Sequence, residues 1–419
     1  MIFDSISDSK KVNIIGSGIV GLCCALHLQR DGWGVTIIDK VGPGESCSYG
    51  HAGVLSETSA LPNAMPGVIS KVPKWLLDPE GPLCIRMRYL PHLLPWLLRF
   101  VKAGTASESE NTVRSLLDLN AGTVEKYQNL ISSSQAGSLI RSSGYLNVYQ
   151  SESSYKHASA GWELLQRHGA QLRMLNGREL HELEPMLAPS YIRAVMIENQ
   201  GYATNPYRLA QVLSEQFSLA GGVFLRREVR EARLSADGNV RLNLDLGHIE
   251  SGKLVVAAGA WSHQITAQLG IHIPLETERG YHVTLAHPEV KPRHVIMEAG
   301  HKFVATPMEM GIRFAGTAEL AGLTASPNYE RADILLRLGK RMFPGLSGTE
   351  KTEWMGHRPS LPDSRPVIGK CPDAPNILFA FGHGHRGLIG APMTGEIIAD
   401  LMANRQPKID IAPFRPERF

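Results

Sequence analysis

The stretch KVNIIGSGIVGLCCALHLQRDGWGVTIID, residues 11–39, joins two short apolar runs through a glycine-rich turn and an apolar helical segment. The first run, Lys11 to Ile15, leads into the turn, and apolar residues then recur at helical spacing as far as Arg30. The second run, Val35 to Asp39, ends in an acid. The pattern predicts a strand, a helix and a second strand, which together form a βαβ unit.

The turn in this unit reads GSGIVG and carries Gly16, Gly18 and Gly21. The first glycine permits a tight turn, the second lets the backbone approach a pyrophosphate, and the third lets the helix pack closely on the strand. A phosphate then lies at the amino terminus of the helix, where unpaired N–H groups favour negative charge. Asp39 follows at the position where a carboxylate binds the adenosine ribose, which argues against the 2′-phosphate of NADP. The unit therefore predicts binding of a dinucleotide, either FAD or NAD.

The composition excludes several classes of protein. The chain has 419 residues, enough for two to three domains, and its net charge of +3 is too small for a dedicated nucleic-acid binder. Its five cysteines include no CxxC pair, so neither a disulfide framework nor a zinc site is indicated. His383 and His385 have no third ligand nearby in the sequence, and we expect no metal. The 41 glycines exceed average usage, and part of this excess falls in residues 16–21, 42–53 and 382–395.

Four further motifs follow the first in a fixed order. They are PGESCSYGHAG (43–53), KLVVAAGAWS (253–262), GHRPSLPDSRPVIG (356–369) and FGHGHRGLIGAPMTG (381–395). With these five motifs the chain resembles the FAD-dependent amino-acid dehydrogenases and oxidases of the D-amino-acid oxidase superfamily, nearest to bacterial D-amino-acid dehydrogenases. The resemblance runs from Gly16 to the final helix and implies FAD as the cofactor.

The strand and helix pattern indicates that both ends of the chain form one nucleotide-binding domain, with the middle inserted as a second. The resemblance implies an α/β fold with a Rossmann-like FAD-binding domain and a second α+β substrate domain on a mixed or antiparallel sheet. We expect the FAD-binding domain to comprise residues 1–90, 201–270 and 351–419. The substrate domain then comprises residues 91–200 and 271–350.

The resemblance also implies which residues hold FAD. The adenosine half would lie against the first glycine motif and Asp39, which replaces the glutamate usual in the family, and the backbone of Val229 would meet the adenine. The serine-rich loop would line the pyrophosphate and flavin, and the last glycine loop would direct a helix amino terminus at the flavin. The cofactor-binding candidates are Gly16, Gly18, Gly21, Asp39, Ser46, Ser48, Gly53, Val229, Ala258, Gly259, Gly384 and Gly387.

An arginine is the fitting partner for a substrate carboxylate because its fork donates two parallel hydrogen bonds. Arg358 is the first candidate, since it occupies the arginine of the family's GLRP-like motif, although His357 stands where leucine is usual. Its alternative role is a structural ion pair with Asp363. Arg279 is the second candidate, with an ordinary strand-edge charge as its alternative. Tyr281 shares the strand face of Arg279 and is a candidate to donate a hydrogen bond from its hydroxyl to the substrate.

His51 lies in the predicted flavin-edge loop, either as a substrate contact or as a partner for loop backbone. The flavin performs the redox chemistry, so we expect no catalytic base. The implied reaction is oxidation of the Cα–N bond of a D-amino acid, including a cyclic imino acid such as a hydroxyproline isomer. Hydride passes to flavin N5, and the resulting imine hydrolyses to a 2-oxo acid and ammonia.

Three other functions stay open. A sarcosine-oxidase-like enzyme would oxidise secondary amines, and a non-turnover FAD-binding subunit would serve a heteromeric oxidase. An NAD-dependent dehydrogenase is the third, although the last glycine loop speaks against it. The electron acceptor, whether oxygen, a quinone or a carrier protein, also stays open.

Residues 86–102 include the most apolar stretch of the chain, YLPHLLPWLLRFV, residues 89–101. This stretch is too short to span a bilayer and is interrupted by prolines. It is either a packed amphipathic helix or a peripheral membrane contact in which Arg86, Arg88, Arg99 and Lys102 flank leucines and Trp96. No apolar run precedes a cleavage site near the first residue, so we expect a cytoplasmic location, with peripheral contact with the inner membrane as the alternative.

Overall fold

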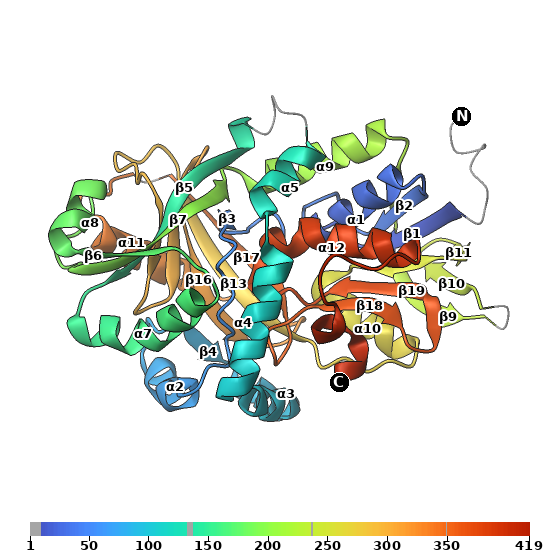
Figure 1. The fold of residues 1–419 in the computed structure, drawn as a ribbon, viewed down its shortest axis with the longest axis horizontal. Coiled ribbons are helices and arrows are strands. Elements are labelled where there is room, and N and C mark those ends of the chain that lie inside the picture. Colours follow the sequence, from blue (N-terminus) through green and yellow to red (C-terminus); the bar gives the residue numbers. More distant parts are fainter. Residues whose placement is uncertain (1–9, 132–136, 236–237, 349) are drawn as a thin grey trace.

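A mainly parallel sheet, built from both ends of the chain and from strands within residues 223–256, forms one side of the molecule (Figure 1). The computed structural model describes residues 10–131, 137–235, 238–348 and 350–419. The strand order is β18-β19-β12-β1-β2-β8, and only β18 runs antiparallel to its neighbour. The six strands are β1 (Lys11–Ile15), β2 (Gly34–Asp39), β8 (Val223–Arg226), β12 (Leu254–Val256), β18 (Val367–Cys371) and β19 (Ala374–Phe381).

The predicted βαβ unit is confirmed, with α1 (Ile19–Arg30) between β1 and β2. The last long helix of the chain, α12 (Gly387–Met402), packs against α1. A Cβ atom at Gly395 would lie 2.7 Å from the Cys23 carbonyl oxygen, so only glycine allows the two helix backbones to approach this closely. The helix α9 (Pro206–Leu219) packs against α1 as well. The two ends of the chain therefore share one core, as the sequence predicts.

A large mixed sheet forms the other side of the molecule (Figure 1). Its main order is β17-β13-β16-β15-β14-β5-β7-β3, with β4 beside β16 and β6 beside β7. Most pairs are antiparallel, whereas β14–β5 and β16–β4 are parallel. The strands are β3 (Val54–Leu55), β4 (Leu83–Ile85), β5 (Ile140–Tyr149), β6 (Leu172–Asn176), β7 (Arg193–Ala203), β13 (Glu276–Leu285), β14 (Val295–Glu298), β15 (Phe303–Met308), β16 (Gly311–Leu320) and β17 (Lys351–Ser360). This arrangement confirms the predicted fold class.

The two faces of the large sheet have different partners. One face packs under α11 (Glu330–Met342), where Tyr281, Val283 and Phe314 belong to the same buried cluster. The opposite face meets the loop that follows β2, because the His282 ring on β13 bonds the Gly50 carbonyl at 3.0 Å. Side chains on this second face are therefore the ones that can reach a cofactor held by the nucleotide-binding sheet.

A small antiparallel sheet completes the nucleotide-binding side. It consists of β9 (Val229–Leu234), β10 (Val240–Leu244) and β11 (His248–Ser251). Together with α10 (Ser262–Gln268), it packs on the six-stranded sheet in a shared apolar cluster.

Sheet membership differs from the division predicted from sequence in two places. The strands β3 and β4 fall within residues 1–90, and β17 falls within residues 351–419, yet all three pair in the large sheet. Strands of two and three residues carry too little periodicity to show which sheet they join. The division into two domains stays a proposal, now with β3, β4 and β17 on the substrate side.

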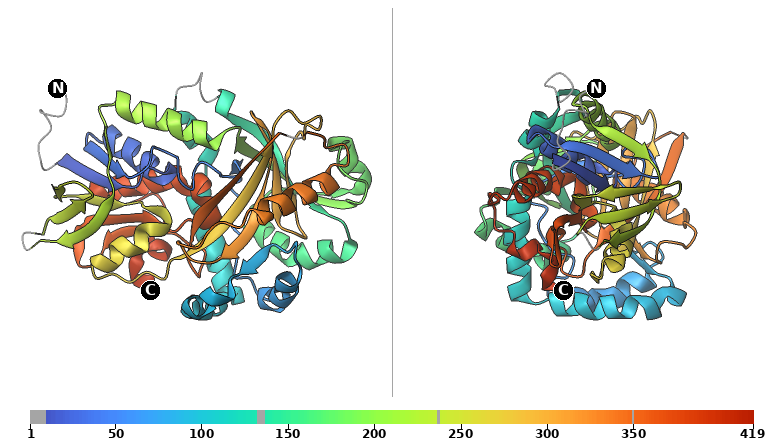
Figure 2. Two further views of the ribbon diagram at one scale, coloured as in Figure 1. Left: turned by 180° about the vertical axis from the view of Figure 1, so that it is seen from behind. Right: turned by 90° about the vertical axis from the view of Figure 1, so that its right-hand side faces the viewer.

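The apolar stretch in residues 86–102 folds as a helix, α3 (Leu90–Ala103), which follows the short turn η3 (Met87–Tyr89). With α2 (Val68–Leu77) it lies along the lower edge of the molecule, both from behind and from the side (Figure 2). The remaining long helices are α4 (Ala106–Asn120), α5 (Thr123–Leu130), α7 (Glu152–Arg167) and α8 (Gly177–Leu183). Among the residues that the structure describes, no helix is both long and apolar enough to cross a membrane.

Candidate active site

The three glycines of the first motif have different structural requirements. A Cβ atom at Gly16, which has φ +111°, would lie 2.3 Å from the Ala257 carbonyl oxygen, and one at Gly21 would lie 2.0 Å from the Gly16 carbonyl oxygen. Packing of the fold itself therefore demands glycine at both positions. At Gly18 the backbone has φ −69°, and a Cβ atom would meet only the Ser48 hydroxyl, at 3.4 Å. The protein leaves this backbone open, as a bound pyrophosphate requires.

Asp39 lies at the end of β2 and reaches over the glycine turn. One carboxylate oxygen accepts hydrogen bonds from the Ser17 backbone N–H at 2.7 Å and its hydroxyl at 2.9 Å, and the other accepts from the Val41 N–H at 3.2 Å. The backbone N–H of Arg227 donates to the Asp39 carbonyl at 2.9 Å, which brings the chain leading to Val229 beside the same strand end. The predicted ribose and adenine residues are thus brought together.

The loop after β2 runs along the amino terminus of α1. The Ile19 N–H donates to the Ser48 hydroxyl at 2.9 Å, and the Gly44 N–H donates to the Ser17 carbonyl at 2.9 Å. The Ser46 carbonyl accepts from the Tyr49 N–H in the same turn. Ser48 therefore lies where the unpaired N–H groups of the helix would meet a phosphate.

His51 joins this loop to the last glycine loop. Its Nδ1 accepts from the Gly53 N–H at 3.0 Å, so its Nε2 carries the proton and donates to the His385 carbonyl at 3.0 Å. Burial lowers the pKa of His51 to about 4, which keeps the ring neutral. Both nitrogens are engaged by backbone, as the second interpretation of this residue predicts, so the predicted substrate contact gains no support.

Two further glycine turns leave open backbone around the same region. Gly259 has φ +55° and a Cβ there would meet nothing within 4 Å, while Ala258 caps the short turn that Gly259 begins. Gly384 has φ +58° and a Cβ would approach only the Ser360 hydroxyl, at 3.7 Å; Gly387 begins α12. Together with the open backbone at Gly18, these two glycine turns (the open backbone cradles) fit an extended dinucleotide cofactor.

Arg358 lies on the face of the large sheet that meets the loop after β2. It pairs with Glu278 across β17 and β13, and its Nη1 donates to a Glu278 carboxylate oxygen at 3.0 Å and to the Thr317 carbonyl at 2.8 Å. Its Nη2 donates once, to the Gly316 carbonyl at 3.2 Å. In the described part of the chain, the Nε–H and the second Nη2–H have no hydrogen-bond partner. Arg358 therefore retains two N–H groups for a carboxylate.

The close approach of Arg358 to the sheet depends on Gly280. A Cβ atom at Gly280 would lie 2.1 Å from Nη2 and 2.2 Å from Cζ of Arg358. The alternative that Arg358 pairs with Asp363 is wrong, because Asp363 binds Arg365 at 3.1 Å and Arg418 at 2.8 Å. Glu278 is its ion-pair partner instead.

Arg279 and Tyr281 lie on the opposite face of β13. All three nitrogens of the Arg279 guanidinium donate to carbonyls of residues 322–326, and the side chain is fully buried. Tyr281 shares that face, as predicted, but its hydroxyl donates to Glu319, and Glu319 also pairs with Arg86. These contacts favour the structural alternative for Arg279 and give no support to a substrate contact by either residue.

Several residues that hold the loop after β2 were not recognised in the sequence. The His282 ring bonds the Gly50 carbonyl, as described above. Arg313 donates to the His51 carbonyl at 2.8 Å, and Thr306 donates to the Ala52 carbonyl at 2.8 Å. His282 alternates with Tyr281, so its direction could have been inferred once the face of Tyr281 was known. Arg313 and Thr306 carry no such signal, because their approach to the loop depends on long-range strand pairing.

Gly50 places this loop against the strand that carries the candidate arginine, because a Cβ atom at Gly50 would lie 2.0 Å from the ring of Trp354 on β17. Burial raises the pKa of the Cys47 thiol in the same loop to about 11, and the Arg358 guanidinium acts in the opposite direction. The loop that would hold the cofactor and the arginine that would hold a carboxylate thus share one site.

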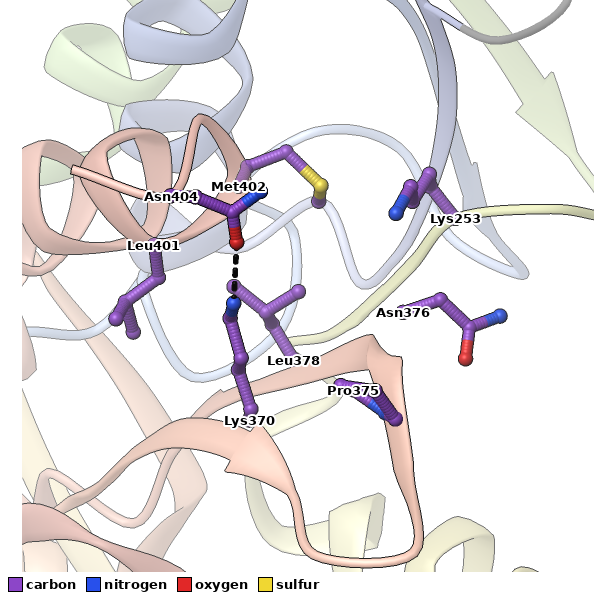
Figure 3. Close-up of a pocket in the computed structure, with 8 residues that line it drawn as sticks. All are labelled: Lys253, Lys370, Pro375, Asn376, Leu378, Leu401, Met402 and Asn404. Atoms are coloured by element: carbon purple, nitrogen blue, oxygen red, sulfur yellow. Dashed lines mark hydrogen bonds between the residues drawn. The ribbon is translucent and has the colours of Figure 1, made fainter.

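A surface hollow at the other end of the nucleotide-binding sheet is not part of this site (Figure 3). Lys253 directly precedes β12 there, and Lys370 on β18 donates to Asn404 at 2.7 Å. The hollow therefore lies at the amino end of β12, whereas ligands of such sheets bind at the carboxyl ends of the parallel strands.

Known proteins with similar sequences and structures cover nearly the whole chain. A family model described as FAD dependent oxidoreductase matches residues 11–401. The chain is 39% identical to D-amino-acid oxidase of Bradyrhizobium diazoefficiens and 32% identical to D-amino acid dehydrogenase of Paramagnetospirillum magneticum, in alignments that cover 98% of this chain and 99% of each relative.

Solved structures show the same fold. L-proline dehydrogenase from P. horikoshii matches with a TM-score of 0.75 at 20% identity, over 99% of this chain and 98% of that one. Glycine oxidase from Geobacillus kaustophilus matches with a TM-score of 0.73 at 20% identity, over 98% and 99%. At these identities the likeness establishes the architecture.

Proposed function

Because the chain belongs to the family of FAD-dependent oxidoreductases, and its relatives are named for action on D-amino acids, we propose that it oxidises the Cα–N bond of a D-amino acid. The product is an imine, which water hydrolyses to a 2-oxo acid and ammonia. Cyclic imino acids, such as a hydroxyproline isomer, belong to the proposed substrate range because they carry the same carboxylate beside a secondary amine. Their ring imine releases no ammonia on hydrolysis, because the nitrogen stays attached to the opened chain.

FAD, when bound, supplies the two-electron acceptor for this oxidation. The residues proposed to hold it are those of the open backbone cradles and their neighbours: the glycine turn with Asp39, the Ser46–Ser48 loop and Gly53, Val229, and the turns at Ala258–Gly259 and Gly384–Gly387. Neutral His51 holds the loop after β2 against the last glycine loop.

The observation that carries the substrate proposal is that two N–H groups of the Arg358 guanidinium have no hydrogen-bond partner in the described residues. Glu278 and two carbonyls fix its position through Nη1 and one N–H of Nη2, and the remaining edge presents two donors. Nε–H and Nη2–H on one edge match the spacing of the two oxygens of a carboxylate. A substrate bound there would have its Cα held in a fixed position relative to the loop after β2, which is proposed to hold the cofactor.

An anaerobic substrate screen tests this proposal. The FAD-loaded enzyme is mixed with D-amino acids, L-amino acids, cyclic imino acids and N-methyl amines, and bleaching of the flavin absorbance is followed. We expect bleaching by D-amino acids or their cyclic counterparts. Bleaching by N-methyl amines alone would instead support a sarcosine-oxidase-like enzyme, and no bleaching by any substrate would support a non-turnover subunit.

The acceptor that reoxidises the flavin is oxygen, a quinone or a carrier protein. Comparing reoxidation by dissolved oxygen with that by a soluble quinone distinguishes the first two, and a carrier is indicated if neither is fast.

For location we propose the cytoplasm, with the alternative of contact with the inner membrane through residues 86–102. All five cysteines are free, which is the usual state in a reducing compartment.

A further inference from the structure

Exposed apolar side chains are concentrated on α2, η3 and α3. Of the 15 large apolar side chains that are exposed in the described residues, seven lie between residues 69 and 101. On α3, Leu94, Leu98 and Val101 are 52%, 65% and 51% exposed. Their spacing of four and three residues places them on one helix face. Scattered exposed apolar residues are ordinary, but a contiguous patch marks an interaction surface.

The helix α2 extends the same surface. Ile69, Leu76 and Leu77 on α2 are exposed, and so is Met87 on η3. No residue of α2 is buried. The two helices lie together at one edge of the molecule, away from the α9 side (Figures 1 and 2). We call the exposed apolar side chains of this edge, Ile69, Leu76, Leu77, Met87, Leu94, Leu98 and Val101, the α2–α3 surface.

The inward face of η3 and α3 is anchored by polar contacts, so the apolar side chains on the other face of α3 point outward. The Trp96 indole N–H donates to the Ser360 carbonyl at 3.3 Å, and the Tyr89 hydroxyl donates to Glu276 at 2.9 Å. Arg86 donates to Glu319 at 2.8 Å. Trp96 and Arg86 therefore support the helix from within, and only part of the interfacial set expected from the sequence faces outward.

The charges beside the α2–α3 surface are mainly positive. Exposed basic side chains without an ion-pair partner in the described part of the chain are Lys71, Lys74, Arg88, Arg99 and Lys102. The segment has two acids: Glu80 is paired with Arg337 and Arg341, and an Asp78 oxygen accepts from the Glu80 N–H. The surface thus combines apolar side chains with unpaired positive charge.

We propose that the α2–α3 surface binds the surface of an anionic phospholipid bilayer. Leucine side chains would enter the boundary between headgroups and acyl chains, and the lysines and arginines would pair with phosphate headgroups. A second copy of the chain fits less well, because self-association through this face would bring positive charges together. This inference is independent of the proposed reaction, since it rests on contacts outside the Arg358 site.

Co-sedimentation of the FAD-loaded enzyme with vesicles tests the inference without any turnover. The probes are vesicles of phosphatidylcholine alone and vesicles that also contain phosphatidylglycerol. We expect binding to the anionic vesicles, weakening as salt is raised. Leu98→Glu should lower the binding constant at least about tenfold, and replacing Lys102 by alanine about fivefold.

Leu219→Glu is the matched control, because Leu219 is a 73% exposed leucine at the end of α9, on another side of the molecule. It should bind vesicles as the unchanged enzyme does. Melting temperature and flavin absorbance establish that each variant is folded. Equal loss of binding in both leucine variants, or no vesicle binding by the unchanged enzyme, would overturn the inference. A dimer that Leu98→Glu dissociates, without vesicle binding, would overturn it as well and identify a second copy as the occupant.

Discussion

Gly280 is the residue whose replacement tests the geometry of the site most sharply, because the three nearest atoms to an added Cβ all belong to the Arg358 guanidinium. A Cβ atom at this position would lie 2.1 Å from Arg358 Nη2, whereas ordinary contact begins near 3.4 Å. In Gly280→Ala the guanidinium must therefore move by about 1.3 Å, and a misplacement of about 1 Å costs roughly 100-fold in rate. We expect kcat/KM to fall by about that factor.

The assay is anaerobic flavin reduction by the best D-amino acid from the substrate screen, measured over a range of concentrations. Flavin content and melting temperature should stay near those of the unchanged enzyme, since Gly280 does not line the cradles that would hold FAD. Gly345→Ala is the control, because a Cβ there would meet nothing closer than 3.8 Å. Unchanged kcat/KM in Gly280→Ala would refute the assignment of Arg358 as the carboxylate-binding residue.

Three further changes separate cofactor binding, positioning of the arginine and the pH dependence of stability. Gly18→Val should yield folded protein with little FAD, because only Ser48 lies near the added carbon; retained flavin absorbance would contradict this. Glu278→Ala should raise KM about tenfold by releasing Arg358, and an unchanged KM would argue against its positioning role. Burial lowers the pKa of His51 to about 4 and that of His383 to about 3, below the ordinary 6.5. The unfolded chain therefore binds more protons than the folded one between pH 6.5 and about 4, and the melting temperature should fall as pH decreases through this window; a flat profile from pH 7 to pH 4 would count against neutral buried histidines.

Local features of the nucleotide-binding half could be predicted from the sequence because each depends on residues close together in the chain. Gly21 meets the Gly16 carbonyl within the βαβ unit itself, and Asp39 follows in the next strand, whereas the contact of Gly16 with Ala257 could not be read from the local sequence. The glycine spacing therefore predicted both the nucleotide-binding fold and the class of cofactor.

The choice between Arg358 and Arg279 depended instead on contacts between distant strands. The sequence ranked Arg358 first on its motif but left a structural role open for both arginines, and the pairing of β13 with β17 places one beside Gly280 and the other beneath residues 322–326. A strand pattern predicts alternation of faces but does not show which face meets the cofactor loop. In the same way, the leucine-rich sequence of α3 is apolar on both sides, so the inward direction of Trp96 became evident only from its contact with Ser360.

The most direct test of the central claim compares Arg358→Ala with the unchanged enzyme in anaerobic flavin reduction by a D-amino acid and by the amine that lacks its carboxylate. The proposed role predicts fast reduction of the unchanged enzyme by the amino acid alone, and a loss of at least about 100-fold in the variant with FAD retained. Equal rates for the variant and the unchanged enzyme with the amino acid would contradict it.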